Sequence, residues 1–311
     1  MKVFNTLSGK KENLVPIEEN KIKMYVCGMT VYDDTHIGHA RTFISFDLIV
    51  RYLRSINYEV HYIRNITDVD DKIIARAEEL NISPKELTEK YIDSMNEDFM
   101  SLGMIEPDSE PRATDNIDSI ISLIEILIEK GHAYEGDSDV YFSAESFDSY
   151  GKLSRRNLED MLAGARVDVD TDKKNPADFV LWKKNTEGLK WDSPWGAGRP
   201  GWHIECSAMS MDALGETFDI HGGGSDLKFP HHENEIAQSE CVTGKEFAKV
   251  WMHTGSLRID KEKMSKSLKN FVTIKDALEI NSPEVLRLFL ISNHYRSPLN
   301  YSEVGLNEAK N

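Results

Sequence analysis

The sequence has few of the features that mark membrane or secreted proteins. No apolar run approaches the roughly 20 residues of a membrane-spanning helix, and the opening MKVFNTLSGKKENLVP lacks the apolar stretch of a secretion signal. The three cysteines, Cys27, Cys206 and Cys241, are too few for a disulfide framework in 311 residues. We therefore expect a cytoplasmic protein with no membrane partner, whose cysteines are buried, bind a metal or act in catalysis.

Positive charge is also scarce. The chain has 37 Lys and Arg residues against 53 Asp and Glu residues. The net charge of −16 argues against a protein whose whole surface is basic, and weakly against binding to nucleic acid. One exception is RIDKEKMSKSLKN, a short run that contains Lys261, Lys263, Lys266 and Lys269. Because net charge describes only the far field, a local anion site is compatible with this composition.

The chain shows no internal repeat, and its apolar pattern predicts alternating strands and helices. Residues 22–28 are typical of a buried strand ending in a glycine turn, and residues 58–67 alternate like a second strand. Between them, apolar residues spaced by three and four from Phe43 to Leu53 predict a helix. This order predicts a parallel α/β unit.

The rest of the chain predicts a domain split by an insertion. One boundary is the stretch at 106–116, which is rich in proline and charge, and the other is the turn-rich stretch 192–201. Between these boundaries we expect a helix that ends at Gly131 and then a β-rich section. Alternation resumes with a helix from Trp202 to Leu214, a strand, a GGGSD turn and a helix from Pro230. The predicted parts are a first catalytic half at 1–115, an α+β insertion at 116–195, a second half at 196–258 and a largely helical region at 259–311.

The stretch THIGH, residues 35–39, lies where the first predicted strand passes into the first predicted helix. His36 and His39 are three residues apart and share one helical face. The backbone N–H groups and dipole of a first helical turn favour anions. Gly38 has no Cβ, so a flat ring such as adenine can approach the backbone there. Two surface histidines near a helix cap would give the same pattern, so this stretch alone is ambiguous.

The lysine-rich stretch KMSKS, residues 263–267, follows about 225 residues later. Such a loop can bring the ammonium groups of Lys263 and Lys266 onto a polyphosphate, although charge runs are usually solvated. Together and in this order, the two stretches resemble the HIGH and KMSKS signatures of class I aminoacyl-tRNA synthetases. The resemblance implies a Rossmann-like catalytic domain that binds ATP at the carboxyl ends of its parallel strands.

The stretch FPHHENE, residues 229–235, contains the side chains of a metal site. Pro230 suits a first helical turn, which would place His231 and Glu235 four residues apart on one helix face. His232 is three residues from Glu235, so spacing does not choose between the two histidines.

Two of the cysteines lie where they can complete such a site. Cys27 ends the first predicted strand, and Cys206 stands near the start of a predicted helix, both at the edge where ATP would bind. Cys241 has no polar partners nearby in the sequence, and we expect it to be a small buried hydrophobe.

Longer stretches resemble the cysteinyl-tRNA synthetase family almost end to end, over residues 2–300. They are MYVCGMTVYDDTHIGHART, RNITDVDDKIIARA, NPADFVLWK, GRPGWHIECSAM and FDIHGGGSDLKFPHHENEIAQSE. The resemblance implies one Zn²⁺ per chain, held by Cys27, Cys206, His231 and Glu235. It also implies a cysteine pocket that includes Gly28, Thr30, Thr67 and Trp202, with His221 either there or in a supporting role. The chain departs from the family at Met29, where proline is usual; we expect little effect because this residue supplies only backbone.

Zinc would distinguish cysteine from serine. A pocket that depends on shape separates near-isosteres by only about a hundredfold, whereas translation needs about 10⁴–10⁵. Zinc binds a thiolate at about 2.3 Å and displaces the thiol proton. Because four protein ligands normally close a zinc site, we expect zinc either to become five-coordinate or to lose Glu235 when cysteine binds. Zinc–ligand distances with and without cysteine would distinguish these outcomes.

The resemblance also implies the reaction and its partners, which are L-cysteine, ATP with Mg²⁺, and tRNA(Cys). The carboxylate of cysteine, ionised at pH 7, attacks the α-phosphate without a general base, so catalysis depends on positioning and charge stabilisation. His36, His39, Lys263 and Lys266 would contact the phosphates, and Asp226 of the GGGSD turn would bind the ribose. The cysteinyl group then passes to the tRNA. We expect the chain to be a monomer.

Other functions fit part of this pattern. The cysteine ligase of mycothiol synthesis shares the zinc ligands and both signatures but joins cysteine to an amino sugar; here KMSKS and GRPGWHIEC follow the synthetase pattern. A non-catalytic paralogue would have a broken signature, and a small nucleotidyltransferase would lack the zinc ligands.

Synthetases of this type continue into helical domains that bind tRNA. We therefore expect 259–311 to be the KMSKS loop and the start of a stem-contact region, in a shortened chain that activates cysteine but charges tRNA poorly.

Overall fold

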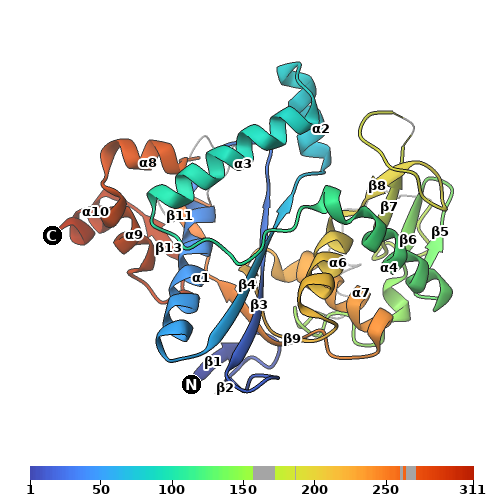
Figure 1. Cartoon of the computed structure of the whole chain (residues 1–311), viewed down its shortest axis with the longest axis horizontal. Helices are drawn as coiled ribbons and strands as arrows, with labels where there is room; N and C mark the ends of the chain where they lie inside the picture. Colours follow the sequence, from blue (N-terminus) through green and yellow to red (C-terminus); the bar gives the residue numbers. More distant parts are fainter. Residues whose placement is uncertain (157–171, 186, 260–261, 264–270) are drawn as a thin grey trace.

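The computed structural model describes residues 1–156, 172–185, 187–259, 262–263 and 271–311. Its centre is a parallel sheet in the order β10-β9-β3-β4 (Figure 1). The four strands are β3 (Lys21–Thr30), β4 (Glu59–Thr67), β9 (Phe218–Gly224) and β10 (Ala248–Thr254). The predicted α/β class and the two predicted strands of the first half are thus confirmed. The first strand does not end in a turn at Gly28 as predicted, because its pairing with β4 shifts register between Val26 and Met29 and continues to Thr30.

A short extended segment widens this sheet beside β4. Ser109 and Arg112 form parallel bridges with Ile63 and Ile66 of β4. With this segment as a fifth member, the strands follow the order 3-2-1-4-5 of a doubly wound fold, in which the order reverses between β3 and β9. Ligands of such sheets bind at the carboxyl ends of the strands, where the order reverses.

Helices from distant parts of the chain cover the two faces of the sheet. The helices of the first half are α1 (Ile37–Ser55), α2 (Asp71–Leu80) and α3 (Pro84–Ser101). The helix within the predicted insertion is α4 (Ile117–Glu129), and those of the second half are α6 (Trp202–Leu214) and α7 (Glu233–Thr243). Those of the last region are α8 (Ile274–Ile280), α9 (Pro283–Ile291) and α10 (Glu303–Lys310). No helix within the described ranges has both the length and the apolar character needed to cross a bilayer.

A second sheet, antiparallel, lies beyond α4, α6 and α7 (Figure 1). Its strands, in the order β5-β6-β7-β8, are β5 (Ala133–Glu135), β6 (Asp139–Phe142), β7 (Phe179–Lys184) and β8 (Gly198–Pro200). Two smaller sheets contain β1 (Lys2–Asn5) with β2 (Lys10–Asn13), and β12 (Glu262–Lys263), β11 (Leu257–Ile259) and β13 (Leu299–Tyr301). Short turns of helix are η1 (Ala113–Asn116), η2 (Ala144–Ser146) and η3 (Lys228–His232). Strands β5, β6 and β7 fall within the expected α+β insertion at 116–195, whereas β8 lies just beyond it; the boundaries of the insertion stay a prediction.

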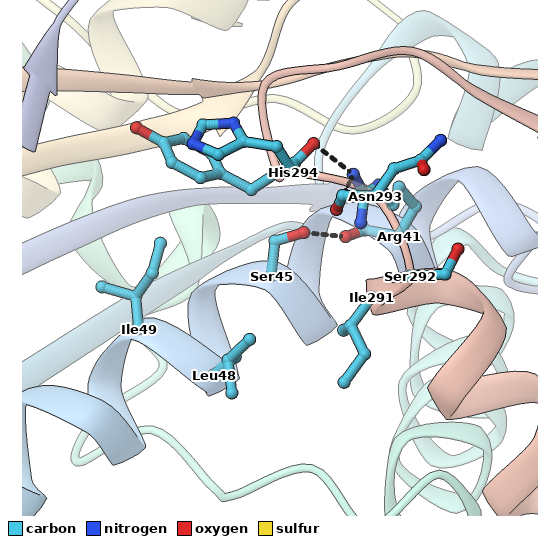
Figure 2. A pocket seen from close by; sticks show the side chains of 9 residues that line it. Arg41, Ser45, Leu48, Ile49, Ile291, Ser292, Asn293 and His294 are labelled. Atoms are coloured by element: carbon cyan, nitrogen blue, oxygen red, sulfur yellow. Dashed lines mark hydrogen bonds between the residues drawn. The ribbon is translucent and has the colours of Figure 1, made fainter.

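The long helix α1 is hydrogen-bonded to the last turn of α9 and to the residues that follow it. The Arg41 guanidinium, 1 % exposed, donates hydrogen bonds to the carbonyl groups of Leu290, Asn293 and His294. Figure 2 shows this contact beside a hollow of about 280 Å³ between α1 and residues 291–295. The unpaired carbonyl groups at a helix end attract cations, so Arg41 holds α1 against the last helical region.

Candidate active site and metal centre

The alternation of side chains along β3 places Cys27. Ile22, Met24 and Val26 point into the core that includes α1, whereas Tyr25 and Cys27 point to the opposite face, toward α6 and α7. Successive side chains of a strand face opposite sides, and burying each of the three aliphatic side chains contributes about 1.5–3 kcal/mol. This apolar pattern fixes the face on which the Cys27 thiol emerges.

Four potential metal ligands from four elements meet on that face. They are Cys27 on β3, Cys206 on α6, His231 in η3 and Glu235 on α7, and their ligand atoms lie within 4.8 Å of one another. The two sulfur atoms are 3.7 Å apart, Cys27 Sγ is 3.4 Å from Glu235 Oε1, and His231 Nε2 is 3.1 Å from the same oxygen.

These spacings suit a tetrahedral zinc ion. Two sulfurs bound to zinc at about 2.3 Å lie about 3.8 Å apart, close to the 3.7 Å between Cys27 and Cys206. His231 Nε2 is buried and, although it lies 3.1 Å from Glu235 Oε1, it makes no hydrogen bond to any residue that the structure describes. A nitrogen without a hydrogen bond is costly to bury unless another group, such as a cation, binds it. The ligand set therefore fits zinc in its chemistry as well as in its spacing.

A second set of ligands overlaps the first. Cys27 and Glu235 also group with His221 and His232 within 4.8 Å. His232 Nε2 lies 3.9 Å from Glu235 Oε1, farther than His231 Nε2 at 3.1 Å, while His221 Nε2 lies 2.7 Å from the other oxygen of Glu235. The proximity of His231 to Glu235 favours the first set, and the contact with His221 orients the Glu235 carboxylate.

Burial controls the charge of the cluster. Desolvation raises the pKa of the Cys27 thiol well above its usual value and lowers the pKa of the His231 imidazole well below its own. The hydrogen bond from Cys27 lowers the pKa of Cys206, but desolvation and the nearby Glu235 outweigh it, and the pKa is raised. The imidazole is thus in the neutral form that binds metals, and a cation would be needed to stabilise the thiolates.

Two histidines that sequence reasoning overlooked stand behind the cluster. His203 Nδ1 lies 2.9 Å from His231 Nδ1, and His253 Nε2 lies 2.9 Å from His232 Nδ1. Burial lowers the pKa of His203 to about 4 and that of His253 to about 3, so both are neutral at pH 7. His253, near the carboxyl end of β10, could have been found from the rule that ligands bind at strand ends. Partners of this kind orient metal-binding imidazoles.

The helix predicted from Pro230 begins with a π-helical turn. Phe229 has extended backbone angles, and it is the only residue of η3 with non-helical angles. Helical backbone therefore starts at Pro230, as predicted, whereas the regular α-helix α7 begins at Glu233. His231 and Glu235 face each other because the turn continues into the helix.

Two of the three residues between the predicted ligands His231 and Glu235 bind the insertion instead. Glu233 is fully buried and accepts hydrogen bonds from the backbone N–H groups of Gly151, Leu153 and Ser154. Asn234, also buried, accepts one from the Tyr150 hydroxyl. Sequence reasoning missed both, because each partner lies about 80 residues away in the chain. They fasten the metal-bearing helix to the edge of the insertion.

The predicted cysteine-pocket residues lie on β3, β4 and β9 and at the start of α6. Thr30 and Thr67 are paired across β3 and β4 at the carboxyl ends of these strands. Trp202, the first residue of α6, is 38 % exposed and stacks on His231 with ring centroids 4.1 Å apart. His221, on β9, is fully buried and stacks on Trp251. Beside the cluster, Trp202 is thus partly exposed, whereas His221 is fully buried.

Gly28 has a steric reason to be glycine. A Cβ there would lie 1.7 Å from the backbone oxygen of Asn65 on β4, and the Gly28 N–H donates to Asn65 Oδ1 at 2.8 Å. The Asn65 side chain also lies 3.7 Å from Cys206 Sγ. Asn65 therefore connects β3, β4 and α6 beside the cluster, a link that the sequence did not reveal.

The first turn of α1 is capped by its own histidines. His36 Nδ1 accepts from His39 N at 3.2 Å, His39 Nδ1 lies 3.5 Å from His36 N, and the two rings stack with centroids 3.6 Å apart. Burial first, and then His36, lower the pKa of His39 well below its usual value. Ile37 N donates to Val272 O. Two first-turn N–H groups that we expected to be available to an anion are thus already bonded, whereas Gly38 is half-buried at the same turn.

The remaining nucleotide-site candidates lie at the ends of β9 and β12. Asp226 is exposed just after β9, and a Cβ on Gly224 would lie 2.4 Å from its carboxylate. Lys263 ends β12, where it is paired with Arg258. Lys266 falls outside the described residues. The β9 turn and the α1 turn flank the point where the strand order reverses.

Comparison with known proteins assigns the family. The model of the family described as tRNA synthetases class I (C) catalytic domain matches residues 13–311. Among curated relatives, the cysteine–tRNA ligase of Marinomonas sp. (strain MWYL1) is 60% identical over 100% of this chain and 68% of its own length. That of Pelobacter propionicus is 59% identical over 100% of this chain and 63% of its own length, and that of Marinobacter nauticus 59% over 99% and 67%. The chain thus spans about two thirds of the length of these relatives.

Solved structures agree on the fold. Methionyl-tRNA synthetase of Mycobacterium tuberculosis, in complex with methionyl-adenylate, is similar with a TM-score of 0.75 at 15% identity, over 93% of this chain and 67% of that chain. A leucyl-tRNA synthetase (LeuRS) of Agrobacterium radiobacter K84 is similar with a TM-score of 0.65 at 11% identity, over 95% and 72%. With a family match that extends over nearly every residue, this chain belongs to the class I tRNA synthetases, as a catalytic domain of the (C) type.

Proposed function

We propose that this chain activates L-cysteine with ATP to form cysteinyl-adenylate, and that the cysteinyl group then passes to tRNA(Cys). The observation that carries the proposal is the buried cluster of two thiols, an imidazole and a carboxylate at the point where the strand order reverses. The curated relatives at 59–60% identity are named cysteine–tRNA ligases, and this agrees with a thiol-binding site.

In this proposal Cys27, Cys206, His231 and Glu235 hold zinc, and His221 holds the Glu235 carboxylate in place. Zinc, when bound, supplies a preference for a thiolate over a hydroxyl group. The exposed Trp202 indole, stacked on His231, covers one side of this site. A cysteine side chain would reach the cluster, whereas its carboxylate would extend toward the α1 turn.

On the nucleotide side, His36, His39, Lys263 and Lys266 are proposed to contact the phosphates with Mg²⁺, and Gly38 and Asp226 the adenosine. The stacked histidines use their Nδ1 atoms for capping, so each ring is held in one orientation. Catalysis then depends on holding the carboxylate of cysteine in line with the α-phosphate and on stabilising the charge that develops there.

The test is cysteine-dependent pyrophosphate exchange, measured with cysteine and with serine in metal-loaded and chelator-stripped protein. We expect exchange with cysteine in the loaded protein, at least about 10⁴-fold less with serine, and loss on stripping that added zinc restores. Equal rates with the two amino acids, or full activity in protein free of metal, would reject the proposal.

A further inference from the structure

The turn that leads into α1 is joined directly to the segment that follows the KMSKS stretch. Ile37 N donates to Val272 O at 3.1 Å, and Ile274 N donates to Thr35 O at 2.9 Å. The His36 ring also meets the Phe271 ring edge-on, with centroids 5.0 Å apart. The turn at residues 35–37 is therefore joined to residues 271–274, although more than 200 residues separate the two segments in the sequence.

A carboxyl group from a third element reaches this junction. The Thr35 hydroxyl donates to the Asp98 carboxylate of α3, and the two residues are 1 % and 3 % exposed. Thr35 thus binds α3 through its side chain and the start of α8 through its carbonyl group. Because a buried hydrogen bond to a charged group is strong and has few geometries, Asp98 fixes the position of the residue that precedes His36.

A more exposed set of contacts supports the same junction. Asp34 Oδ1 accepts from Ser94 Oγ at 2.9 Å and from Lys275 Nζ at 3.2 Å, and Lys275 Nζ lies 2.7 Å from Ser94 Oγ. The Asp34 and Lys275 side chains are 38 % and 49 % exposed, so solvent screens this ion pair and it contributes little. The buried bond of Asp98 is the part that carries the positioning.

We propose that Asp98 is a positioning residue for ATP: through Thr35 it holds His36 and the first turn of α1 in register with the segment after KMSKS. Asp98 itself need not touch the nucleotide. The inference rests on the proposed function, because it assigns the α1 turn to ATP. It adds α3, an element without any predicted site residue, to the machinery of activation.

Helix α1, whose first turn Asp98 is proposed to position, also contains a residue suited to a matched control. Asp47, on α1, is 2 % exposed and binds Arg51, Arg287 and the backbone N–H of Ile105. Like Asp98, it is a buried carboxylate that fastens α1 to other elements. It lies eleven residues beyond His36, about 16 Å along the helix axis. Loss of Asp47 should therefore lower stability without moving the α1 turn.

The experiment measures kcat and KM for ATP and for cysteine in pyrophosphate exchange, together with the thermal midpoint and zinc content. The variants are Thr35→Val, which removes the hydroxyl at nearly constant shape, Asp98→Ala, the conservative Thr35→Ser, and Asp47→Ala. We expect Thr35→Val and Asp98→Ala to lower kcat/KM for ATP about tenfold, the effect of losing one charge-assisted hydrogen bond. KM for cysteine and zinc content should stay unchanged, and the double variant should be no worse than either single one.

Thr35→Ser should restore the ATP parameters, and Asp47→Ala should lower the thermal midpoint with ATP parameters near those of the parent. The proposal is overturned if Thr35→Val leaves kcat/KM for ATP within twofold of the parent, or if Asp47→Ala impairs ATP use as strongly. Should Asp98→Ala fail to fold, the Thr35 pair decides. Failure of the parent chain to exchange pyrophosphate would count against the proposed function instead, which keeps the two results distinct.

Discussion

The metal cluster and the first turn of α1 are two polar sites beside the same parallel sheet, and they differ in burial and in how many elements form them. The cluster is assembled from β3, α6, η3 and α7, and its members are at most 3 % exposed. The α1 turn is contiguous, half-buried and capped by its own side chains. A buried group of thiols, imidazoles and a carboxylate is costly without a cation, whereas a capped turn is stable by itself.

This difference separates two ways of holding a ligand. The cluster is shaped by packing from all sides, which suits discrimination between two side chains that differ in one atom. The turn is open and depends on a few contacts, which suits a large and highly charged nucleotide. Variants at the two sites should therefore fail differently: those in the cluster should lose metal and cysteine selectivity together, and those at the turn should lose rate.

The largest effect is expected for Cys206→Ala. Removal of one thiol from the cluster should lower zinc affinity by more than about a hundredfold and abolish cysteine-dependent exchange. Zinc content by mass spectrometry and the exchange rate are the measurements. The control is Cys241→Ala on α7, a buried cysteine outside both candidate ligand sets. If Cys206→Ala retained one zinc per chain, the assignment of this ligand would be wrong.

Lys266→Ala addresses the nucleotide side. A positioned ammonium group that stabilises charge in the transition state is worth about a hundredfold in rate, so adenylate formation should slow by that order. Cysteine affinity, measured by calorimetry, and zinc content should remain unchanged. The exposed Lys2→Ala serves as a control for the loss of one positive charge. Equal losses of rate and of cysteine affinity would contradict the role assigned to Lys266.

Two glutamates on α7 allow a sharper comparison, because Glu235 belongs to the metal cluster and Glu233 does not. Glu235→Gln should release zinc while leaving much of the stability intact. Glu233→Gln weakens the acceptor of three backbone N–H groups and should cost about 1.5–3 kcal/mol of stability with zinc retained. Chemical denaturation and metal content measure the two effects. The same outcome for both variants would mean that the two carboxylates are not functionally separate.

The smallest effect is expected at Ser83, the N-cap of α3, far along the helix from Asp98. Ser83→Ala should lower the free energy of unfolding by about 1 kcal/mol at pH 7 without changing exchange kinetics. Hydrogen bonds from the Ser83 backbone and hydroxyl lower the pKa of Glu86 below its ordinary value of 4.5. A lowered carboxyl pKa stabilises the fold above 4.5, and this contribution is lost as pH falls. The difference between parent and variant should therefore shrink in acid; a constant difference would exclude a role for Glu86.

Much of the framework followed from the sequence. A buried apolar stretch predicted β3, alternation predicted β4, the spacing from Phe43 to Leu53 predicted α1, and the helix Trp202–Leu214 was predicted at both ends. Helical backbone does start at Pro230 as predicted, but no local signal showed that its first turn is π-helical and that the regular α-helix α7 begins only at Glu233. The assignment of particular ligands, pocket residues and domain boundaries stays a prediction.

The amino-acid sequence by itself determined the order of elements and the kinds of side chain at each strand end, because apolar periodicity and turn residues act locally. Tertiary structure alone decided which of these side chains meet. Asp98 and Thr35 are 63 residues apart, and Glu233 binds a loop about 80 residues away. The local sequence of neither segment predicts its contact with the other, because such contacts depend on how whole helices pack on the sheet.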